Sequence, residues 1–183
     1  VKNDLGTLVL TGSNTYTGST AIAAGTLQIG NGGTTGSISG AVDNAGTLAF
    51  NRSDSYTFGG QIFGTGAIRQ IGGGTTTLTA NSSGFTGTTT VENGTLAVNG
   101  RLGGSVGVQS GATLTGSGML TGAVSVANGG TLAGVQGQTL MTGDLTLASG
   151  ADVDVRLGAP GNTSLFRVAG DLTLDGTLNV TDA

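Results

Sequence analysis

The phrase Gly-Thr-Leu recurs along this 183-residue chain, and its spacing is the feature that most restricts the fold. Each phrase continues as a short alternating strand and then ends at a glycine or an asparagine, as in residues 26–29 (TLQI) and 95–98 (TLAV). Alternation places the apolar side chains on one face of a strand. The leucines of the phrase and of its variant Gly-Ala-Thr-Leu are Leu8, Leu27, Leu48, Leu96, Leu114, Leu132 and Leu178.

The leucines fall into two series with regular intervals. Leu8, Leu27 and Leu48 follow one another at a period typical of solenoid repeats, and from Leu78 to Leu132 the interval is slightly shorter and constant. One such unit cannot bury its apolar face, whereas stacked units can. The sequence therefore predicts an all-β fold, a right-handed parallel β-helix (solenoid) of about nine coils whose leucines form one interior ladder. The longer gap between Leu48 and Leu78 predicts an extra turn near residues 66–68.

A β-sandwich or a closed barrel is the competing architecture, because it also uses many short strands. Asn-Gly pairs, which favour tight hairpins, are present. The strand phrase nevertheless recurs once per period rather than in adjoining pairs, which favours the solenoid. Glycines and asparagines such as Asn81 and Asn93 are expected at the corners, where positive φ angles are needed. Pro160 is expected in a loop between strands.

Composition removes several classes of function. Only 9% of residues are charged, the net charge is −4, and the six basic residues are scattered, so nucleic acid is not expected as a partner. The chain has no cysteine and no histidine, which excludes thiolate chemistry and the commonest general base and metal ligand. We expect no enzyme activity, no catalytic residue, no cofactor and no metal. No apolar run reaches the length of a spanning helix, so the chain is expected to be soluble.

Two segments share a longer motif. Residues 10–29 and 78–98 both follow the pattern L-T-G-x-N-x-Y-T-G-x-T, an apolar pair, then G-T-L, with one residue inserted before the aromatic of the second copy and Ala80 in place of a glycine. This pattern resembles the passenger-associated repeat of autotransporter proteins, with copies at about 8–30 and 76–100. The motif positions are Tyr16, Gly18, Gly25, Thr26 and Leu27 in the first copy and Phe85, Gly87, Gly94, Thr95 and Leu96 in the second.

The resemblance implies a setting for the chain. Residues 1–183 would be one β-helical segment of a longer passenger, whose C-terminal membrane β-barrel lies outside this chain and is its partner. Such a passenger is secreted by the type V route and displayed at the bacterial cell surface, attached to the outer membrane. The implied role is a stalk that aids folding, secretion and display. The alternative is an adhesin segment that binds host surface or matrix molecules or neighbouring bacterial cells.

Two further patterns have competing interpretations. Residues 103–107 (GGSVG) match the nucleophile elbow of serine hydrolases, but without a histidine a chance match is the better interpretation. Asp152, Asp154 and Arg156 alternate on one strand face. They form either a solvated surface with a local ion pair, or part of an oxygen-ligand site for calcium, or part of a carboxylate pair of a polysaccharide lyase or hydrolase.

The aromatic residues also have two interpretations. Tyr16 and Phe85 occupy equivalent motif positions, and Tyr56, Phe58 and Phe63 cluster between the two copies. Equivalent placement favours packing over ligand binding, and their exposure decides between the two.

Overall fold

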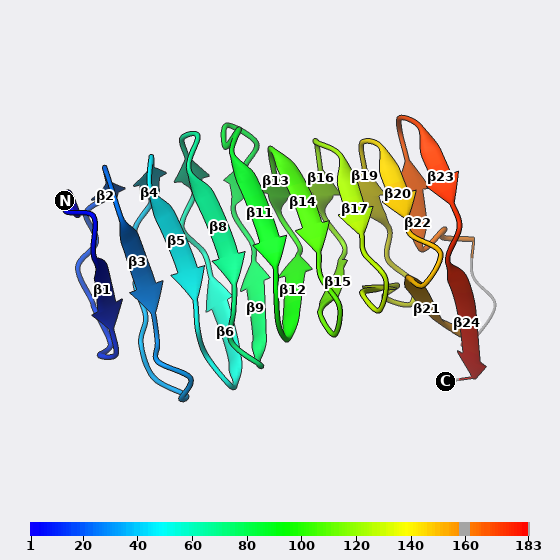
Figure 1. The fold of residues 1–183 in the computed structure, drawn as a ribbon, viewed down its shortest axis with the longest axis horizontal. Helices are drawn as coiled ribbons and strands as arrows, with labels where there is room; N and C mark the ends of the chain where they lie inside the picture. The colour runs from blue at the N-terminus through cyan, green and yellow to red at the C-terminus, as the bar shows by residue number, and fades with distance from the viewer. Residues whose placement is uncertain (158–161, 183) are drawn as a thin grey trace.

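The computed structural model describes residues 1–157 and 162–182, and in that part of the chain every regular element is a β-strand. The strands wind into a rod with the two chain ends at opposite ends (Figure 1). The longest sheet, called here the nine-stranded sheet, runs in the order β1 (Thr7–Leu10), β3 (Thr26–Ile29), β5 (Thr47–Phe50), β8 (Ala67–Gln70), β11 (Thr88–Val91), β14 (Ser105–Val108), β17 (Val124–Val126), β20 (Leu145–Leu147) and β23 (Leu172–Leu174).

Two further faces complete the rod. The seven-stranded sheet contains β6 (Ser55–Phe58), β9 (Thr75–Leu78), β12 (Thr95–Val98), β15 (Thr113–Gly116), β18 (Thr131–Ala133), β21 (Asp152–Leu157) and β24 (Thr177–Asp182). The third face holds short strands in two groups, first β2 (Thr20–Ile22), β4 (Val42–Asn44) and β7 (Ile62–Phe63), then β10 (Asn81–Ser82), β13 (Arg101–Leu102), β16 (Met119–Leu120), β19 (Leu140–Thr142) and β22 (Phe166–Val168).

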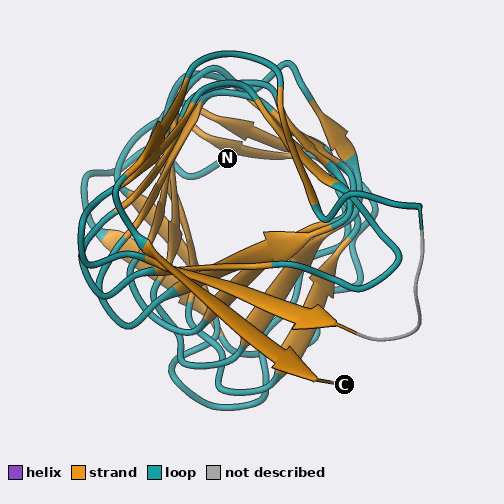
Figure 2. Ribbon diagram, turned by 90° about the vertical axis from the view of Figure 1, so that its right-hand side faces the viewer, coloured by secondary structure: helices purple, strands orange, loops and turns teal. Residues whose placement is uncertain are grey.

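The described strands confirm the predicted parallel β-helix. Every pairing between them is parallel, and the three faces enclose one interior when the rod is viewed from its end (Figure 2). The two groups of the third face join where the Ile62 amide donates to the Ser82 hydroxyl at 2.9 Å. The expected number of about nine coils is slightly too high, although the longest sheet has nine described strands. The seven-stranded sheet shows that about seven turns carry strands on both long faces.

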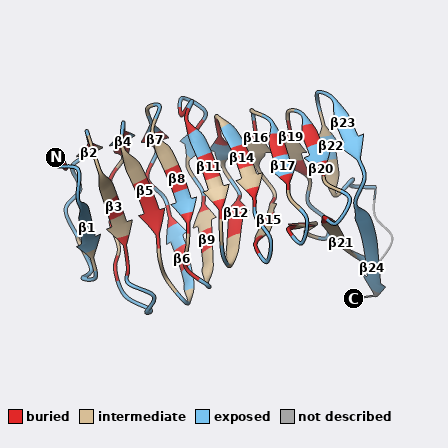
Figure 3. Ribbon diagram, in the orientation of Figure 1, coloured by how far each residue is buried: buried red, intermediate tan, exposed pale blue. Residues whose placement is uncertain are grey.

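The core consists of side chains that point inward at alternate positions and stack from coil to coil. In the nine-stranded sheet, one inward column begins Leu8, Leu27, Leu48 and Ile68. Leu27, Leu48 and Ile68 are buried. Ile68 lies in β8, so the extra turn expected near residues 66–68 is confirmed. The inward residues are red in the middle of the rod, and the strands at both ends are more exposed (Figure 3).

The prediction that all the leucines share one ladder is wrong. Leu96 stacks on Leu114 and Leu132, but these residues belong to the seven-stranded sheet, whereas Leu8, Leu27 and Leu48 line the nine-stranded sheet. Leu78 pairs with Val98 rather than with Leu96. The gap between Leu48 and Leu78 therefore contains one full coil, from Leu48 to Ile68, and then the connection from β8 on the nine-stranded sheet to β9 on the seven-stranded sheet. The phrase specifies an inward leucine after a corner, and it occurs on both long sheets.

The corners depend on glycine more than the sequence suggested. All residues with positive φ in the described ranges are glycines, so the prediction that asparagines such as Asn81 adopt this conformation is wrong. The Asn81 and Asn93 side chains instead accept hydrogen bonds from the nearby amides of Ser83 and Gly94. Pro160 lies outside the described residues. Among those residues, no helix is long and apolar enough to cross a membrane.

We predict that truncation of a stacked leucine destabilises the rod far more than truncation of its outward neighbour. Leu114→Ala removes a fully buried side chain from the column formed by Leu96 and Leu132. It should lower the free energy of unfolding by about 2–5 kcal/mol. Thr113→Ala, on the outward side of the same strand, should change it by less than about 1 kcal/mol. Denaturant titration monitored by circular dichroism measures both, and equal effects would contradict the assigned register.

Candidate functional site: the two motif copies

The two motif copies have the same local structure. Alignment of the copies places β1 on β9 and β3 on β12. The corner bond is also shared, because the Thr26 amide donates to the Gly6 carbonyl at 3.0 Å and the Thr95 amide donates to the Gly74 carbonyl at 3.0 Å. The inserted residue before the aromatic of the second copy is accommodated between the strands without a change in either end.

The copies occupy different faces of the rod. The first copy begins on the nine-stranded sheet with β1, passes through β2 on the third face and returns to the nine-stranded sheet with β3. The second copy begins on the seven-stranded sheet with β9, passes through β10 and β11, and returns to the seven-stranded sheet with β12. The motif is therefore a unit of one coil that can start at either long face.

Gly25 and Gly94 occupy the corner before the Thr-Leu strand and require glycine for two reasons. Their φ angles are +64° and +62°, which L side chains rarely adopt. A Cβ atom would also lie 2.4 Å from the Asp4 carbonyl oxygen at Gly25 and 2.4 Å from the Gly74 carbonyl oxygen at Gly94. The previous coil therefore leaves no room for a side chain at this motif position.

The residues after that corner alternate as the sequence predicts. Leu27 and Leu96 are buried in the core, and Thr26 and Thr95 point outward and are half-buried. In parallel sheets, β-branched residues suit the outward positions because they pack on the side chains of neighbouring rungs. Thr95 lies between Thr75 and Thr113 in the register of the seven-stranded sheet.

Gly18 and Gly87 share a motif position but have different surroundings. A Cβ atom at Gly87 would lie only 1.8 Å from the Gly66 carbonyl oxygen, on the preceding coil. A Cβ atom at Gly18 would meet no atom within 4 Å, because no described coil lies on that side. The next coil does approach Gly18, since a Cβ at Gly40 would lie 2.2 Å from the Gly18 carbonyl oxygen. The requirement for glycine here comes from the neighbouring coil.

Tyr16 and Phe85 differ for the same reason. Phe85 is fully buried, which confirms the packing interpretation for the second copy. Tyr16 is 43% exposed and lies at the open end of the first coil, where its hydroxyl is 2.7 Å from the Thr20 hydroxyl. The aromatic position of the motif therefore faces the interior, and its burial depends on whether a coil covers it.

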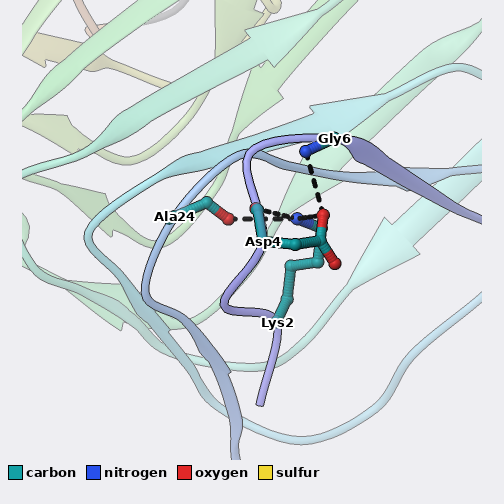
Figure 4. Close-up of polar contacts among 4 residues, drawn as sticks. All are labelled: Lys2, Asp4, Gly6 and Ala24. Carbon is teal, nitrogen blue, oxygen red and sulfur yellow. Dashed lines mark hydrogen bonds and ion pairs between the residues drawn. The ribbon is translucent and has the colours of Figure 1, made fainter.

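A buried polar position in each copy was missed by the sequence analysis. The Lys2 side chain is buried and donates to the carbonyl oxygens of Asp4 and Ala24 and, at 2.7 Å, to the Asp4 carboxylate (Figure 4). Gln70, at the equivalent place in the second copy, is also buried and donates to the Gly72 carbonyl at 2.8 Å. Both side chains therefore satisfy a nearby carbonyl of their own chain segment, inside the corner. Alignment of the copies upstream of Leu8 would have revealed this pair.

The aromatic cluster between the copies belongs mainly to the core. Tyr56 and Phe58 are buried, and Phe63 is 40% exposed. The Tyr56 hydroxyl donates to the Ile38 carbonyl at 2.9 Å, and the Arg52 guanidinium lies 4.9 Å from the Tyr56 ring centroid. Arg52 also pairs with Asp54 at 2.7 Å and holds the pKa of that carboxyl below its ordinary value. Through the hydrogen bond between Tyr56 and Ile38, the cluster holds the loop after β3 against strand β6 of the next coil.

The other sequence patterns form no assembled site. Ser105 of residues 103–107 begins strand β14, without the strand-to-helix turn that a nucleophile elbow requires. Asp152 and Asp154 do share the outward face of β21, where both accept from the Asn179 side chain, at 3.2 and 3.0 Å. Among the described residues, no three acidic, histidine or cysteine side chains are grouped as a metal site would need.

Comparison with known families shows what the repeated unit is similar to. Residues 1–29 and 68–98 match the model of the passenger-associated transport repeat. These two matched ranges are called the transport repeats below. Both matched ranges begin upstream of the copies read from the sequence, and they therefore include Lys2 and Gln70. The equivalence of these two residues in the structure is consistent with the longer range.

A curated relative carries a similar segment. An autotransporter adhesin of Brucella suis biovar 1 (strain 1330), named Adhesin BmaC autotransporter, is 61% identical to this chain over 66 residues. The shared segment covers 36% of this chain and 2% of that adhesin. No solved structure matches the chain at a significant level. The comparisons therefore give a likeness of the two segments to the transport repeat and of one segment to an autotransporter adhesin, while the fold rests on the strand pairing described above.

We predict that the two equivalent glycines of the transport repeats tolerate substitution very differently. Gly87→Ala forces a methyl group against the Gly66 carbonyl and should lower the free energy of unfolding by about 1–3 kcal/mol or more. Gly18→Ala places the same group in open space and should change it by less than about 0.5 kcal/mol. Denaturant midpoints of the two purified variants test this. If Gly18→Ala were as damaging as Gly87→Ala, the coil contact would not be the cause.

We predict that alkaline pH weakens the aromatic cluster. Burial raises the pKa of the Tyr56 hydroxyl, although the hydrogen bond to Ile38 and the charge of Arg52 oppose this shift. The folded chain thus keeps a proton that the unfolded chain loses above a pH of about 10. The contribution of this pKa shift to the free energy of unfolding is fully present below that pH, and it is lost as the pH rises through the pKa of Tyr56 in the folded chain. Tyr56→Phe should be less stable at neutral pH but should lose less stability between pH 9 and 11, as followed by denaturant titration.

Proposed function

We propose that this chain is a segment of the β-helical stalk of an autotransporter passenger and that it aids passenger folding, secretion and display at the bacterial cell surface. The observation that carries the proposal is that the two transport repeats are built into coils of one parallel stack. In this proposal the partner is a C-terminal translocator barrel in the outer membrane, encoded beyond residues 1–183.

Stacked coils suit this role because each coil forms on the edge of its neighbour. A parallel strand at the end of a sheet presents unpaired amide and carbonyl groups, and these serve as a template for the next strand. The contacts join residues of successive coils, as between Thr26 and Thr47, so a coil can fold as soon as it emerges. Each coil added outside a pore then opposes backward movement of the chain.

The composition agrees with passage through a narrow pore. The chain has no cysteine to form cross-links, and 4% of its residues are aromatic. Charged residues make up 9% of the chain, and several of them are paired within a coil or between neighbouring coils. Arg69 on β8 pairs with Glu92 after β11 at 2.5 Å, and this pair joins successive coils on the outer face.

We assign the transport repeats the task of fixing the corners. Gly25 and Gly94 provide the positive φ angle, and Gly87 allows the preceding coil to approach. Leu27 and Leu96 then enter the core as the first inward residues of the new strand. A correctly formed corner sets the register of the strand that follows, because a slip of one residue would turn the leucine outward.

The second candidate is adhesion to host matrix or to neighbouring cells. Its specific support is the relative, which is named an adhesin. The outward side of the seven-stranded sheet also presents a regular row of Ser55, Thr75, Thr95, Thr113 and Thr131, which are in register and uncharged. An extended polar row of this kind could contact a long partner. A polysaccharide lyase or hydrolase has less support, because Asp152 and Asp154 are tied to one asparagine.

We predict that a transport repeat contributes more to display than an ordinary coil. The register allows two deletions that each remove one coil and rejoin equivalent residues. Deletion of residues 75–94 brings Thr95 to the place of Thr75 and removes most of the second copy, and deletion of 113–130 brings Thr131 to the place of Thr113. In the full-length precursor, the first deletion should reduce passenger at the cell surface several-fold, and the second should not.

The measurement is the amount of passenger accessible on intact cells, normalised to total passenger by immunoblotting. Unchanged display from both deletions would contradict a special role for the transport repeat and would direct attention to adhesion by the rod. An equal loss from both would show that coil number, rather than the motif, limits display.

A further inference from the structure

Asparagine is followed directly by glycine at four places in the chain, and each place lies between two strands. The four pairs are Asn31-Gly32, Asn93-Gly94, Asn99-Gly100 and Asn128-Gly129. All four asparagines are exposed. In such a pair the backbone nitrogen of the glycine can attack the side-chain amide carbon of the asparagine, because the glycine has no side chain that hinders the approach. The four pairs have the same chemistry, and hydrogen bonding distinguishes them.

In three of the pairs, a neighbouring coil holds the glycine amide. The amides of Gly32, Gly100 and Gly129 donate to the backbone carbonyls of Asn51, Leu78 and Gly150, at 2.8, 3.0 and 2.6 Å respectively. The Asn99 side chain also accepts from the Ser117 amide of the next coil. The Asn128 side chain likewise accepts from the Gly150 amide. A glycine nitrogen that is bound in this way must give up its hydrogen bond before it can react, which slows the reaction.

The Gly94 amide is bound differently, although this corner has a coil on both sides. Among the described residues it donates to no backbone carbonyl, and its hydrogen bond goes to Oδ1 of the adjacent Asn93 at 2.9 Å. The side-chain carbon Cγ is one C=O bond, about 1.2 Å, from that oxygen, so it lies within about 4 Å of the Gly94 nitrogen. The two atoms that would react are therefore already close, and no bond to another coil holds them apart.

The hydrogen bonds on either side of this peptide can persist during the reaction. The Asn93 amide donates to the Gln70 carbonyl at 3.2 Å, and the Thr95 amide donates to the Gly74 carbonyl at 3.0 Å. Neither bond uses the Gly94 nitrogen or the Asn93 side chain. The preceding coil thus holds both ends of the Asn93-Gly94 peptide in place and leaves its reacting atoms free.

We propose that Asn93 is a site of spontaneous deamidation in the folded chain, with water as the co-reactant. The Gly94 nitrogen loses its proton to solvent and forms a bond to Cγ of Asn93. The bond from Cγ to Nδ2 then breaks, and the nitrogen leaves as ammonia after it takes up a proton from solvent. Water opens the resulting succinimide ring at either carbonyl, which leaves aspartate or isoaspartate at position 93. No atom is oxidised or reduced in these steps.

The isoaspartate product changes the corner that precedes β12. It places one extra methylene in the main chain, directly before the strand that carries the buried Leu96. Because the corner sets the register of this strand, the product should pack less well than the native chain. The equivalent residue of the first transport repeat is Ala24, which cannot react in this way. Deamidation therefore changes one repeat and leaves the other intact, and it does not depend on the proposed role in secretion.

Peptide mapping of the 183-residue chain tests the proposal with three internal controls. The native protein is incubated at pH 8 and 37 °C, and mass spectrometry of its peptides gives the deamidation rate at each asparagine. An isoaspartate-specific methyltransferase detects the isoaspartate product. In the folded chain, Asn93 should react at least about five-fold faster than each of Asn31, Asn99 and Asn128. In guanidinium chloride, where the coils are lost, the four rates should agree within about two-fold, because each asparagine precedes a glycine.

A matched variant tests the effect on stability. Asn93→Ala copies Ala24 of the first repeat, so its denaturation midpoint should stay constant during the incubation, while that of the native chain falls as isoaspartate accumulates. A variant that loses stability as fast as the native chain would contradict this effect. The site itself would be refuted if Asn93 in the folded chain reacted no faster than the other three asparagines. A five-fold excess that persisted in guanidinium chloride would also overturn the proposal, because the cause would then be the local sequence rather than the corner.

Discussion

Backbone hydrogen bonds at the corners join each coil to the previous one, and the rest of the structure depends on them. The Thr26 amide donates to the Gly6 carbonyl, the Thr47 amide to the Gly25 carbonyl and the Ala67 amide to the Gly46 carbonyl, at 2.8–3.0 Å. Each acceptor is a glycine, and a Cβ atom at Gly46 would lie 2.6 Å from the Gly25 carbonyl oxygen. Close approach of backbone to backbone sets the register, and the register places the apolar side chains inside.

This constraint is local to neighbouring coils, which explains why the transport repeat can move around the rod. A coil needs the right corner geometry and the right alternation on the edge below it, and either long sheet provides that edge. The second copy starts on the seven-stranded sheet and the first on the nine-stranded sheet, yet Gly25 and Gly94 have φ angles within a few degrees of each other. Local rules of this kind are expected in solenoids, where each unit contacts only its neighbours.

The sequence predicted the parallel solenoid and the inward leucines because these depend on spacing and alternation alone. It did not predict that Leu96 lines a different sheet from Leu48, since a leucine after a corner has the same sequence pattern on both long sheets. It also placed Tyr16 and Phe85 as equivalents without showing that one is exposed, because burial is decided by the coil on the other side. Lys2 was overlooked for a similar reason, since a charged residue near a strand suggests a solvated surface rather than a buried corner.

Between Thr26 and Thr131, the length of a coil changes together with the side chains in its core. The coils between the successive rungs Thr26, Thr47, Ala67 and Thr88 are longer than those that follow up to Thr131, and this part of the rod encloses Phe50, Tyr56, Phe58 and Phe85. Phe50 contacts Tyr56 and Phe58 with ring centroids 6.1 and 5.8 Å apart. The coils between the rungs Thr95, Thr113 and Thr131 are shorter, and the interior there is filled by leucine and valine.

Interiors pack at nearly constant density, so a wider loop without aromatic side chains would leave a cavity, and a shorter one could not enclose them. Core packing therefore accounts for the change from longer to shorter coils after Thr88, where the core changes from aromatic to aliphatic. The coil from Thr131 to Asp152 is long again around aliphatic side chains, and its loop at 134–139 contains no buried residue, so these residues add length without entering the core. A substitution such as Phe58→Leu would leave a long coil around a core that no longer fills it.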